Sequence, residues 1–186
     1  MTVTNPSEII TRFLADADLL GEVIATGGDW STPSPCEGWS AADVLDHIID
    51  SERAFIGRYG IDLGPAPTGE PAQRWQAHLA VLRGILTDEV MAIEYDGLFG
   101  HTTVGETLRD FYGFDLLVHR WDIGTALGQR IELSPQELDR LEARVPEPGS
   151  KLYDFFYSPQ VCKPPVPVAA GVPRQTEVLA KLGRRA

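Results

Sequence analysis

The sequence has few cysteines, few basic residues and no long apolar run. Cys36 and Cys162 are its only cysteines, and two thiols are too few for the disulfide framework of a small secreted domain. The 16 basic residues face 27 acidic ones, so the net charge is −11 and the chain repels phosphate backbones and anionic membranes. No stretch approaches the roughly 18 apolar residues of a membrane span, and no signal peptide begins at Met1. We therefore expect a cytoplasmic protein that binds neither nucleic acid nor membranes.

The chain does contain enough apolar material for one well-buried core. Hydrophobic residues make up 43% of its 186 residues, which suffices for one core and is short for two. It has no internal repeat and no low-complexity tract. We expect a single domain over residues 1–186.

Four stretches with the helical spacing of apolar residues predict an all-α fold. Asn5 or Ser7 can cap the first stretch, and Ser40 followed by Asp43 forms a capping-box pattern at the start of the second. Residues 92–104 could form a short extended turn, and a shorter helix starts at Ser134. The four main helices are expected at about residues 5–25, 40–60, 75–89 and 105–128.

Proline dominates the C-terminal part of the chain. Seven of the 14 prolines lie from Pro146 onward, which excludes long helices until the final QTEVLAKLGRR. Aromatic residues at 153–157 argue against disorder there. We expect residues 146–186 to be an extension packed on a helical bundle of residues 5–145. The valines and prolines of residues 161–173 are expected to cover one end of that bundle.

The stretch FYGFDLLVHRWDIGTALG, residues 111–128, places titratable groups on the apolar face of a helix. Asp115, His119 and Asp122 are spaced i, i+4, i+7 and so lie along one stripe. A carboxylate and an imidazole that face a core must be paired, hydrogen-bonded or bound to a metal, because an unpaired buried charge is costly. His47 lies at the boundary of the apolar stripe of the second helix, a position that suits a pocket wall.

Spacing alone leaves alternatives open for each of these residues. His119 and Asp115 could be a hydrogen-bonded pair that braces the helices, and Asp122 could pair with Arg120 or could orient a ligand imidazole. His78 and His101 are interpreted as core or surface histidines that could reach a pocket. The two cysteines are interpreted as small buried thiols, because nothing near either one in the sequence supplies a base.

Four segments together resemble a known family: PSPCEGW, the following DVLDHIID, then DLLVHRWDIGTALG, and a proline-rich tail that ends in LGRR. They resemble the DinB/YfiT-like superfamily, and within it the metal-binding proteins similar to the N-terminal domain of mycothiol-dependent maleylpyruvate isomerase. The resemblance implies a DinB-like four-helix bundle with a divalent metal held by His47, Asp115 and His119. The isomerases carry Glu at the position of Asp115. Zinc is the expected metal, and nickel, iron or manganese would also accept these ligands.

Two imidazoles and one carboxylate leave coordination positions of the metal open, which favours a catalytic metal site, and therefore an enzyme, over a structural metal site. The resemblance implies a low-molecular-weight thiol such as mycothiol, used for S-transfer to a small electrophile or for its isomerisation, with Asp122 or a pocket histidine handling protons. One alternative is a non-catalytic module that binds a metal or another ligand. Another is a thiol-independent hydrolase, lyase or isomerase acting on a small carbonyl compound. The expected partners are a small-molecule substrate and the thiol, and the chain is compatible with a homodimer.

Overall fold

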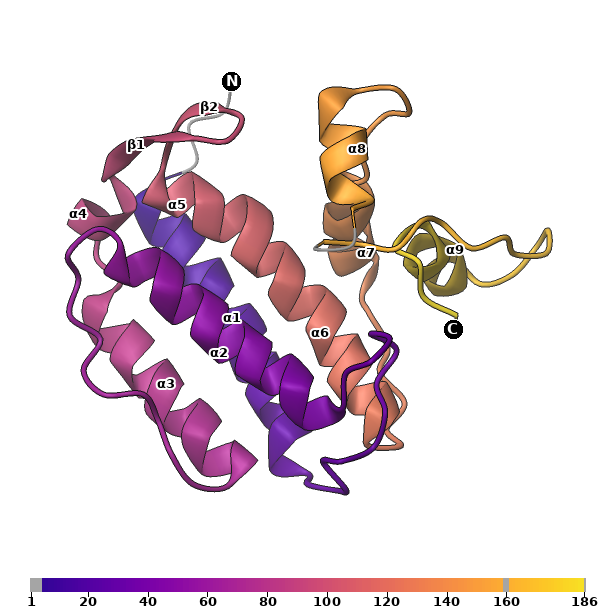
Figure 1. Cartoon of the computed structure of the whole chain (residues 1–186), viewed down its shortest axis with the longest axis horizontal. Helices are drawn as coiled ribbons and strands as arrows, with labels where there is room; N and C mark the ends of the chain where they lie inside the picture. Colours follow the sequence, from indigo (N-terminus) through magenta and orange to yellow (C-terminus); the bar gives the residue numbers. More distant parts are fainter. Residues whose placement is uncertain (1–4, 159–160, 186) are drawn as a thin grey trace.

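The computed structural model describes residues 5–158 and 161–185 and is mainly helical, as predicted (Figure 1). Its longest helices are α1 (Pro6–Ala25), α2 (Ala41–Gly57), α3 (Pro71–Ile85) and α6 (Gly113–Ala126). Both α1 and α2 contact α3 and α6. These four helices enclose the first hydrophobic core.

The first two helices begin where their capping residues predict. Asn5 accepts a hydrogen bond from the Ser7 backbone N–H at 3.1 Å. At the start of α2, Ser40 Oγ accepts from the Asp43 N–H at 3.3 Å, while Asp43 Oδ2 accepts from the Ser40 N–H at 2.8 Å. This reciprocal capping box satisfies two N–H groups that a helix start leaves unpaired. It fixes where α2 begins, and therefore which face of α2 carries His47.

Replacing Ser40 with alanine is expected to destabilise the protein by about 1 kcal/mol, because one capping acceptor is lost. For a chain of this size that corresponds to a drop in melting temperature of roughly 2–4 °C. Thermal unfolding followed by circular dichroism measures the change. Thr68→Ala, at an exposed position in the loop before α3, is the control. An equal effect of the two substitutions would contradict the role of the cap.

After α3 the chain forms a short helix and a hairpin. α3 begins at Pro71, four residues before the predicted start, and the last predicted turn is a separate helix, α4 (Asp88–Met91). Strands β1 (Glu94–Gly97) and β2 (Gly100–Thr103) pair antiparallel, with Gly97 opposite Gly100. Gly100 has φ +117°, a value that favours glycine at this tight turn. The extended turn expected at residues 92–104 is thus a two-stranded hairpin.

The fourth predicted helix is continuous but is interrupted by a π turn. It consists of α5 (Val104–Thr107), the π turn η1 (Leu108–Tyr112) and α6. The Gly113 N–H donates to the Leu108 carbonyl, five residues back, in place of the usual four. A π turn adds one residue to the helix and so changes which side chains face the core on either side of it.

The C-terminal part contains more helix than predicted. α7 (Pro135–Glu142) begins at the expected Ser134 cap, α8 (Lys151–Phe156) was not predicted, and α9 (Arg174–Lys181) closes the chain. Residues 161–173 are mostly exposed, and the Val166 N–H donates to the Ala180 carbonyl beyond the middle of α9. Figure 1 shows this segment looping away from the long helices. Its start contacts the loop before α2, where Lys163 pairs with Glu37, but most of the segment does not cover the end of the bundle as predicted.

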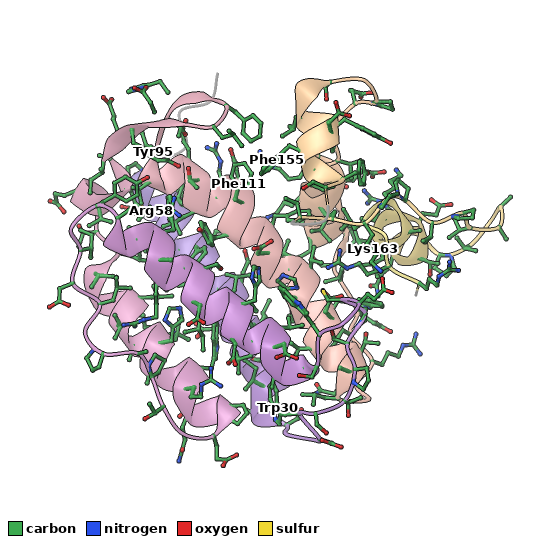
Figure 2. All side chains as sticks on the ribbon, in the orientation of Figure 1. Trp30, Arg58, Tyr95, Phe111, Phe155 and Lys163 are labelled. Atoms are coloured by element: carbon green, nitrogen blue, oxygen red, sulfur yellow. The ribbon has the colours of Figure 1, made fainter. Side chains whose placement is uncertain are left out.

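A second hydrophobic core joins the C-terminal helices to α6. Leu117, Val118 and Trp121 of α6 pack with buried residues of α7, α8 and α9. Helix α6 therefore contributes to both cores. The hairpin also reaches this part of the molecule, because the Phe99 ring lies 6.3 Å from that of Phe111 and 5.2 Å from that of Phe155, measured between centroids. In Figure 2 the labelled Phe111 of η1 and Phe155 of α8 lie near each other.

Within the described residues, no helix combines the length and the apolar character that crossing a membrane requires.

Candidate metal centre

The structure brings His47, Asp115 and His119 together from two helices. His47 Nε2 lies 3.6 Å from Asp115 Oδ2, and the His47 and His119 rings meet edge to face with centroids 5.3 Å apart. One ligand atom from each residue lies within 4.8 Å of the other two. The side chains of His47 and Asp115 are about one-third exposed, and that of His119 is 8% exposed. Three donors of the types that bind zinc therefore converge where solvent can reach them.

The local structure explains this convergence. Asp115 and His119 are one turn apart on α6, so their side chains project from the same face. Helix α2 contacts α6 and presents His47 from its partly exposed side. Thus α6 supplies two donors at fixed spacing and α2 supplies the third.

Asp122 lies behind the site and contacts His119. Its Oδ2 is 2.9 Å from His119 Nδ1, and Asp122 is fully buried. Because an ionised carboxylate only accepts hydrogen bonds, this contact places a proton on Nδ1 and leaves the lone pair of Nε2 free for a metal. This is the tautomer and ring orientation that a ligating histidine needs.

Arg184, close to the end of the described chain, compensates the charge of Asp122. Its Nε and Nη2 donate to the two carboxylate oxygens at 3.2 and 2.8 Å, and its Nη1 donates to the Leu182 carbonyl at 2.7 Å. Burial raises the pKa of Asp122, but the Arg184 charge and the hydrogen bonds from His119 and Arg184 outweigh it and lower the pKa to about 2. Asp122 is therefore ionised at neutral pH. The first arginine of the LGRR motif, Arg184, is the buried residue that balances its charge.

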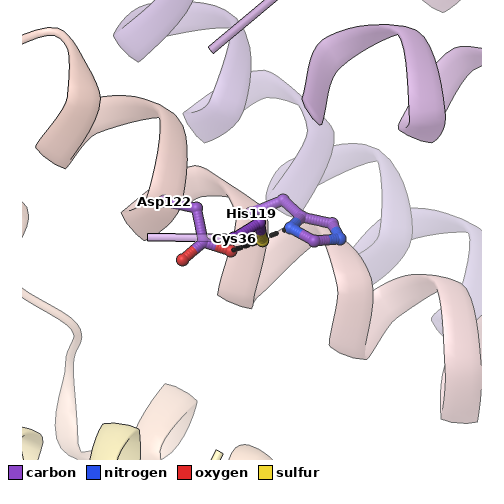
Figure 3. Close-up of side chains that lie close together, drawn as sticks. All are labelled: Cys36, His119 and Asp122. Carbon is purple, nitrogen blue, oxygen red and sulfur yellow. Dashed lines mark hydrogen bonds and ion pairs between the residues drawn. The ribbon is translucent and has the colours of Figure 1, made fainter. Parts of the chain in front are cut away.

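Cys36 completes a second cluster on the inner side of His119 (Figure 3). Its Sγ donates to Asp122 Oδ2 at 3.2 Å and lies 3.4 Å from Arg184 Nη2. Burial and the neighbouring Asp122 charge raise the Cys36 pKa to about 12. Cys36, His119 and Asp122 are close enough to hold a metal. However, Arg184 already donates hydrogen bonds to both carboxylate oxygens of Asp122, and the positive charge of Arg184 disfavours a cation between these three residues.

Cys162 lies on the other side of the same guanidinium. Arg184 Nη1 is 3.8 Å from its Sγ, and burial raises the Cys162 pKa to about 11. Both thiols are therefore protonated at neutral pH, and neither is an activated nucleophile. The interpretation as a buried thiol is confirmed for Cys162, whereas Cys36 is only half-buried.

A surface hollow of about 540 Å³ lies beside His47. The Trp39 ring forms one wall, with its centroid 4.9 Å from that of His47. Three carboxylates also line the hollow, and one of them, Asp46, pairs with Arg74. The approach to His47 is thus acidic and disfavours anionic ligands. The hollow is lined by Gly38, Trp39, Asp43, Asp46, His47, Asp50 and Ser51.

The other two histidines lie outside this group. His78 is fully buried, with Nε2 2.7 Å from Glu52 Oε2. Burial raises the pKa of Glu52, while the contact with His78 lowers it, and the net direction is upward. His101, on the exposed face of β2, pairs with Asp96 at 3.2 Å and with Glu94 at 3.4 Å. His78 is thus a paired core histidine and His101 a surface histidine.

Comparison with known families agrees with the resemblance seen in the sequence. The family model described as the mycothiol maleylpyruvate isomerase N-terminal domain matches residues 11–83. The matched segment includes His47 but ends before Asp115 and His119. The resemblance predicted from the motifs is confirmed over this segment.

Two curated relatives are similar over a longer stretch. They are the uncharacterized proteins MT0763 and Rv0738, from two strains of Mycobacterium tuberculosis. Each is 28% identical over 116 residues, which is 60% of this chain and 62% of the relative. No solved structure matches the chain.

Proposed function

We propose that this protein binds one divalent metal ion through His47, Asp115 and His119 and uses it with a low-molecular-weight thiol such as mycothiol to transform a small electrophile. The convergence of these three side chains carries the proposal, because two imidazoles and a carboxylate are the ligand set of catalytic zinc sites. The match to a mycothiol-related domain supports the thiol. In this proposal α1, α2, α3 and α6 are the four helices of a DinB-like bundle within a single domain.

The donor set fits a metal on grounds internal to the structure. The contact of His119 Nδ1 with Asp122 leaves the lone pair on Nε2, and one ring nitrogen of His119 lies within 4.8 Å of ligand atoms of His47 and Asp115. Its two partners are accessible to solvent, which leaves room for a further ligand. A bound metal would lower the pKa of a coordinated thiol from its free value of about 8.5, so that the thiolate forms at neutral pH.

The role predicted for Asp122 is to handle protons, but its surroundings favour the alternative role of orienting a ligand imidazole. Its carboxyl group is fully buried behind His119 and has a pKa of about 2, so it accepts a proton poorly at neutral pH. We assign it the orientation of His119 and the retention of the Nδ1 proton. Residues of this kind commonly change metal affinity by about 10–100-fold when replaced.

Trp39 and the acidic hollow beside His47 are proposed to receive the substrate or the thiol. The indole ring offers a flat apolar face, and the carboxylates of Asp43 and Asp50 accept hydrogen bonds from hydroxyl or ammonium groups. A neutral, hydroxyl-bearing thiol meets no repulsion there. A thiol with a net negative charge, such as glutathione with its two carboxylates, is repelled by the acidic hollow.

Thiol-dependent turnover is the direct test of the enzyme proposal. Zinc-loaded protein is mixed with mycothiol, bacillithiol, glutathione or cysteine and with electrophiles that include maleylpyruvate and a haloarene. We expect turnover with a neutral thiol, no turnover after metal removal by a chelator, and recovery when zinc is added back. Product formation is followed by chromatography and mass spectrometry.

Other outcomes would identify a different activity. Tight metal binding without turnover under any thiol would contradict the enzyme proposal and indicate a binding module. Metal-dependent turnover of a carbonyl compound in the absence of thiol would contradict the thiol and indicate a Lewis-acid mechanism. Equal rates with glutathione and mycothiol would contradict the proposed effect of the acidic hollow.

A further inference from the structure

A second cavity, of about 280 Å³, opens where α1, η1, α6 and α7 meet. We call it the arginine pocket, because four of its lining residues are arginines. It lies away from His47, Asp115 and His119, none of which lines it. Its walls are Glu8, Ile9, Arg12, Phe13 and Asp16 from α1, Leu108 and Arg109 from η1, Gly113, Phe114 and Leu117 from α6, and Arg140, Ala143 and Arg144 from α7 and the residues after it.

The floor of the arginine pocket is apolar. Phe13 and Leu108 belong to the first hydrophobic core and Leu117 belongs to the second. The three side chains are at most 3% exposed, so the cavity lies over the seam between the two cores. Protein interiors are usually filled at such a seam. An apolar group that entered here would be removed from water against side chains that are already ordered.

The rim of the pocket is rich in positive charge. Arg140 holds the buried Asp16 through two hydrogen bonds, at 3.0 and 2.5 Å. Arg144 contacts Asp110 at 2.7 Å. Arg12 takes part in no ion pair among the described residues. Arg109 pairs with Asp110 as well, and Glu8 also lines the pocket. Four guanidinium groups therefore face three carboxylates, those of Glu8, Asp16 and Asp110, which leaves an excess of one positive charge. In a chain with a net charge of −11, this local excess favours an anion.

We infer that the arginine pocket binds a small amphipathic anion, with an acidic head group at Arg12 and Arg144 and an apolar tail on the floor. A guanidinium group presents planar paired donors that match a carboxylate or a phosphate. The apolar floor selects against inorganic anions, and the arginines select against neutral molecules of the same shape. This inference does not depend on the metal or on the proposed reaction.

Isothermal titration with four probes tests the inference: octanoate, octyl phosphate, octanol and inorganic phosphate. We expect octanoate or octyl phosphate to bind at least about tenfold more tightly than octanol, because one charge-assisted contact contributes on the order of 1.4 kcal/mol. Inorganic phosphate, which has no tail, should bind more weakly than octyl phosphate. The ratio of the two amphipathic anions identifies the preferred head group.

Two variants locate the binding site. Arg12→Gln should weaken binding of the anion about tenfold, whereas Arg130→Gln, at an exposed arginine paired with Glu132, should leave it unchanged. Ala143→Trp places a bulky side chain at the wall and should also weaken binding, and circular dichroism checks that each variant is folded. Octanol binding as tightly as the anions, no binding of either amphipathic anion, or unchanged binding in both Arg12→Gln and Ala143→Trp would overturn the inference.

Discussion

Replacing His119 with alanine is expected to abolish stoichiometric metal binding. His119 is the least exposed of the three proposed ligands and the only one whose second ring nitrogen is fixed by a carboxylate. Its loss leaves His47 and Asp115, two partly exposed side chains that hold an ion weakly. Because replacing residues that only orient a ligand costs about 10–100-fold in affinity, losing the ligand itself should cost more. Metal content of protein purified without a histidine tag and reloaded with zinc measures the effect.

The structure offers a matched control for this substitution. His101→Ala removes another histidine, but one on an exposed strand outside the group, and should leave the zinc content of the protein unchanged. Asp122 keeps its Arg184 partner in His119→Ala, so the variant should fold. Zinc bound in equal amounts by His119→Ala and the parent protein would contradict the site. Less than about a tenth of an equivalent in the parent protein, even after zinc or nickel is added, would contradict the metal proposal itself.

The grouping of His47, Asp115 and His119 could be predicted from the sequence because it depends mostly on local regularity. Asp115 and His119 share a helix, and a spacing of four residues fixes their relative placement without knowledge of the rest of the fold. The sequence determined the position of His47 relative to these two residues less well. Its position at the edge of the apolar stripe of α2 indicated a pocket wall, but only the resemblance to a family placed that wall opposite α6.

The surroundings of the site could not be predicted, because they come from contacts between distant segments. Arg184 is 62 residues from Asp122, and Cys36 is 86 residues from it. Cys36 lies in the loop before α2 and Arg184 lies beyond the end of α9, so the period of a helix does not indicate which way either side chain faces. The LGRR motif was visible in the sequence, but nothing in it signals that the first of its two arginines is buried and the second exposed.

The fold departs from the prediction where local signals compete. The proline-rich composition of the C-terminal part concealed α8, which begins where Ser150 accepts a hydrogen bond from the Tyr153 N–H. The π turn η1 has no sequence signal, because it results from how the helix packs on both cores. The alternation of valine and proline in residues 161–173 resembles a buried strip, yet the structure leaves Val161 and Val168 about 40% exposed.

Replacing Arg184 with methionine is expected to destabilise the protein far more than loss of the Ser40 cap does. The side chain of Arg184 is 8% exposed and forms a two-point contact with the fully buried Asp122. Methionine fills similar space but leaves the carboxylate buried without its counter-charge, which typically costs about 3–5 kcal/mol. Thermal or urea unfolding of the metal-free protein measures the loss. Arg185→Met, one residue later and exposed, should change little.

A second substitution separates loss of the charge pair from loss of packing. Arg184→Met combined with Asp122→Asn removes both charges, so the double variant should be more stable than Arg184→Met alone, because no unpaired carboxylate remains buried. Its zinc affinity should still fall about 10–100-fold relative to the parent protein, since an amide holds the His119 Nδ1 proton less strongly than a carboxylate does. If Arg184→Met matched Arg185→Met in stability, or if the double variant were less stable than Arg184→Met, the charge pair would not be what ties the C-terminal segment to the proposed metal site.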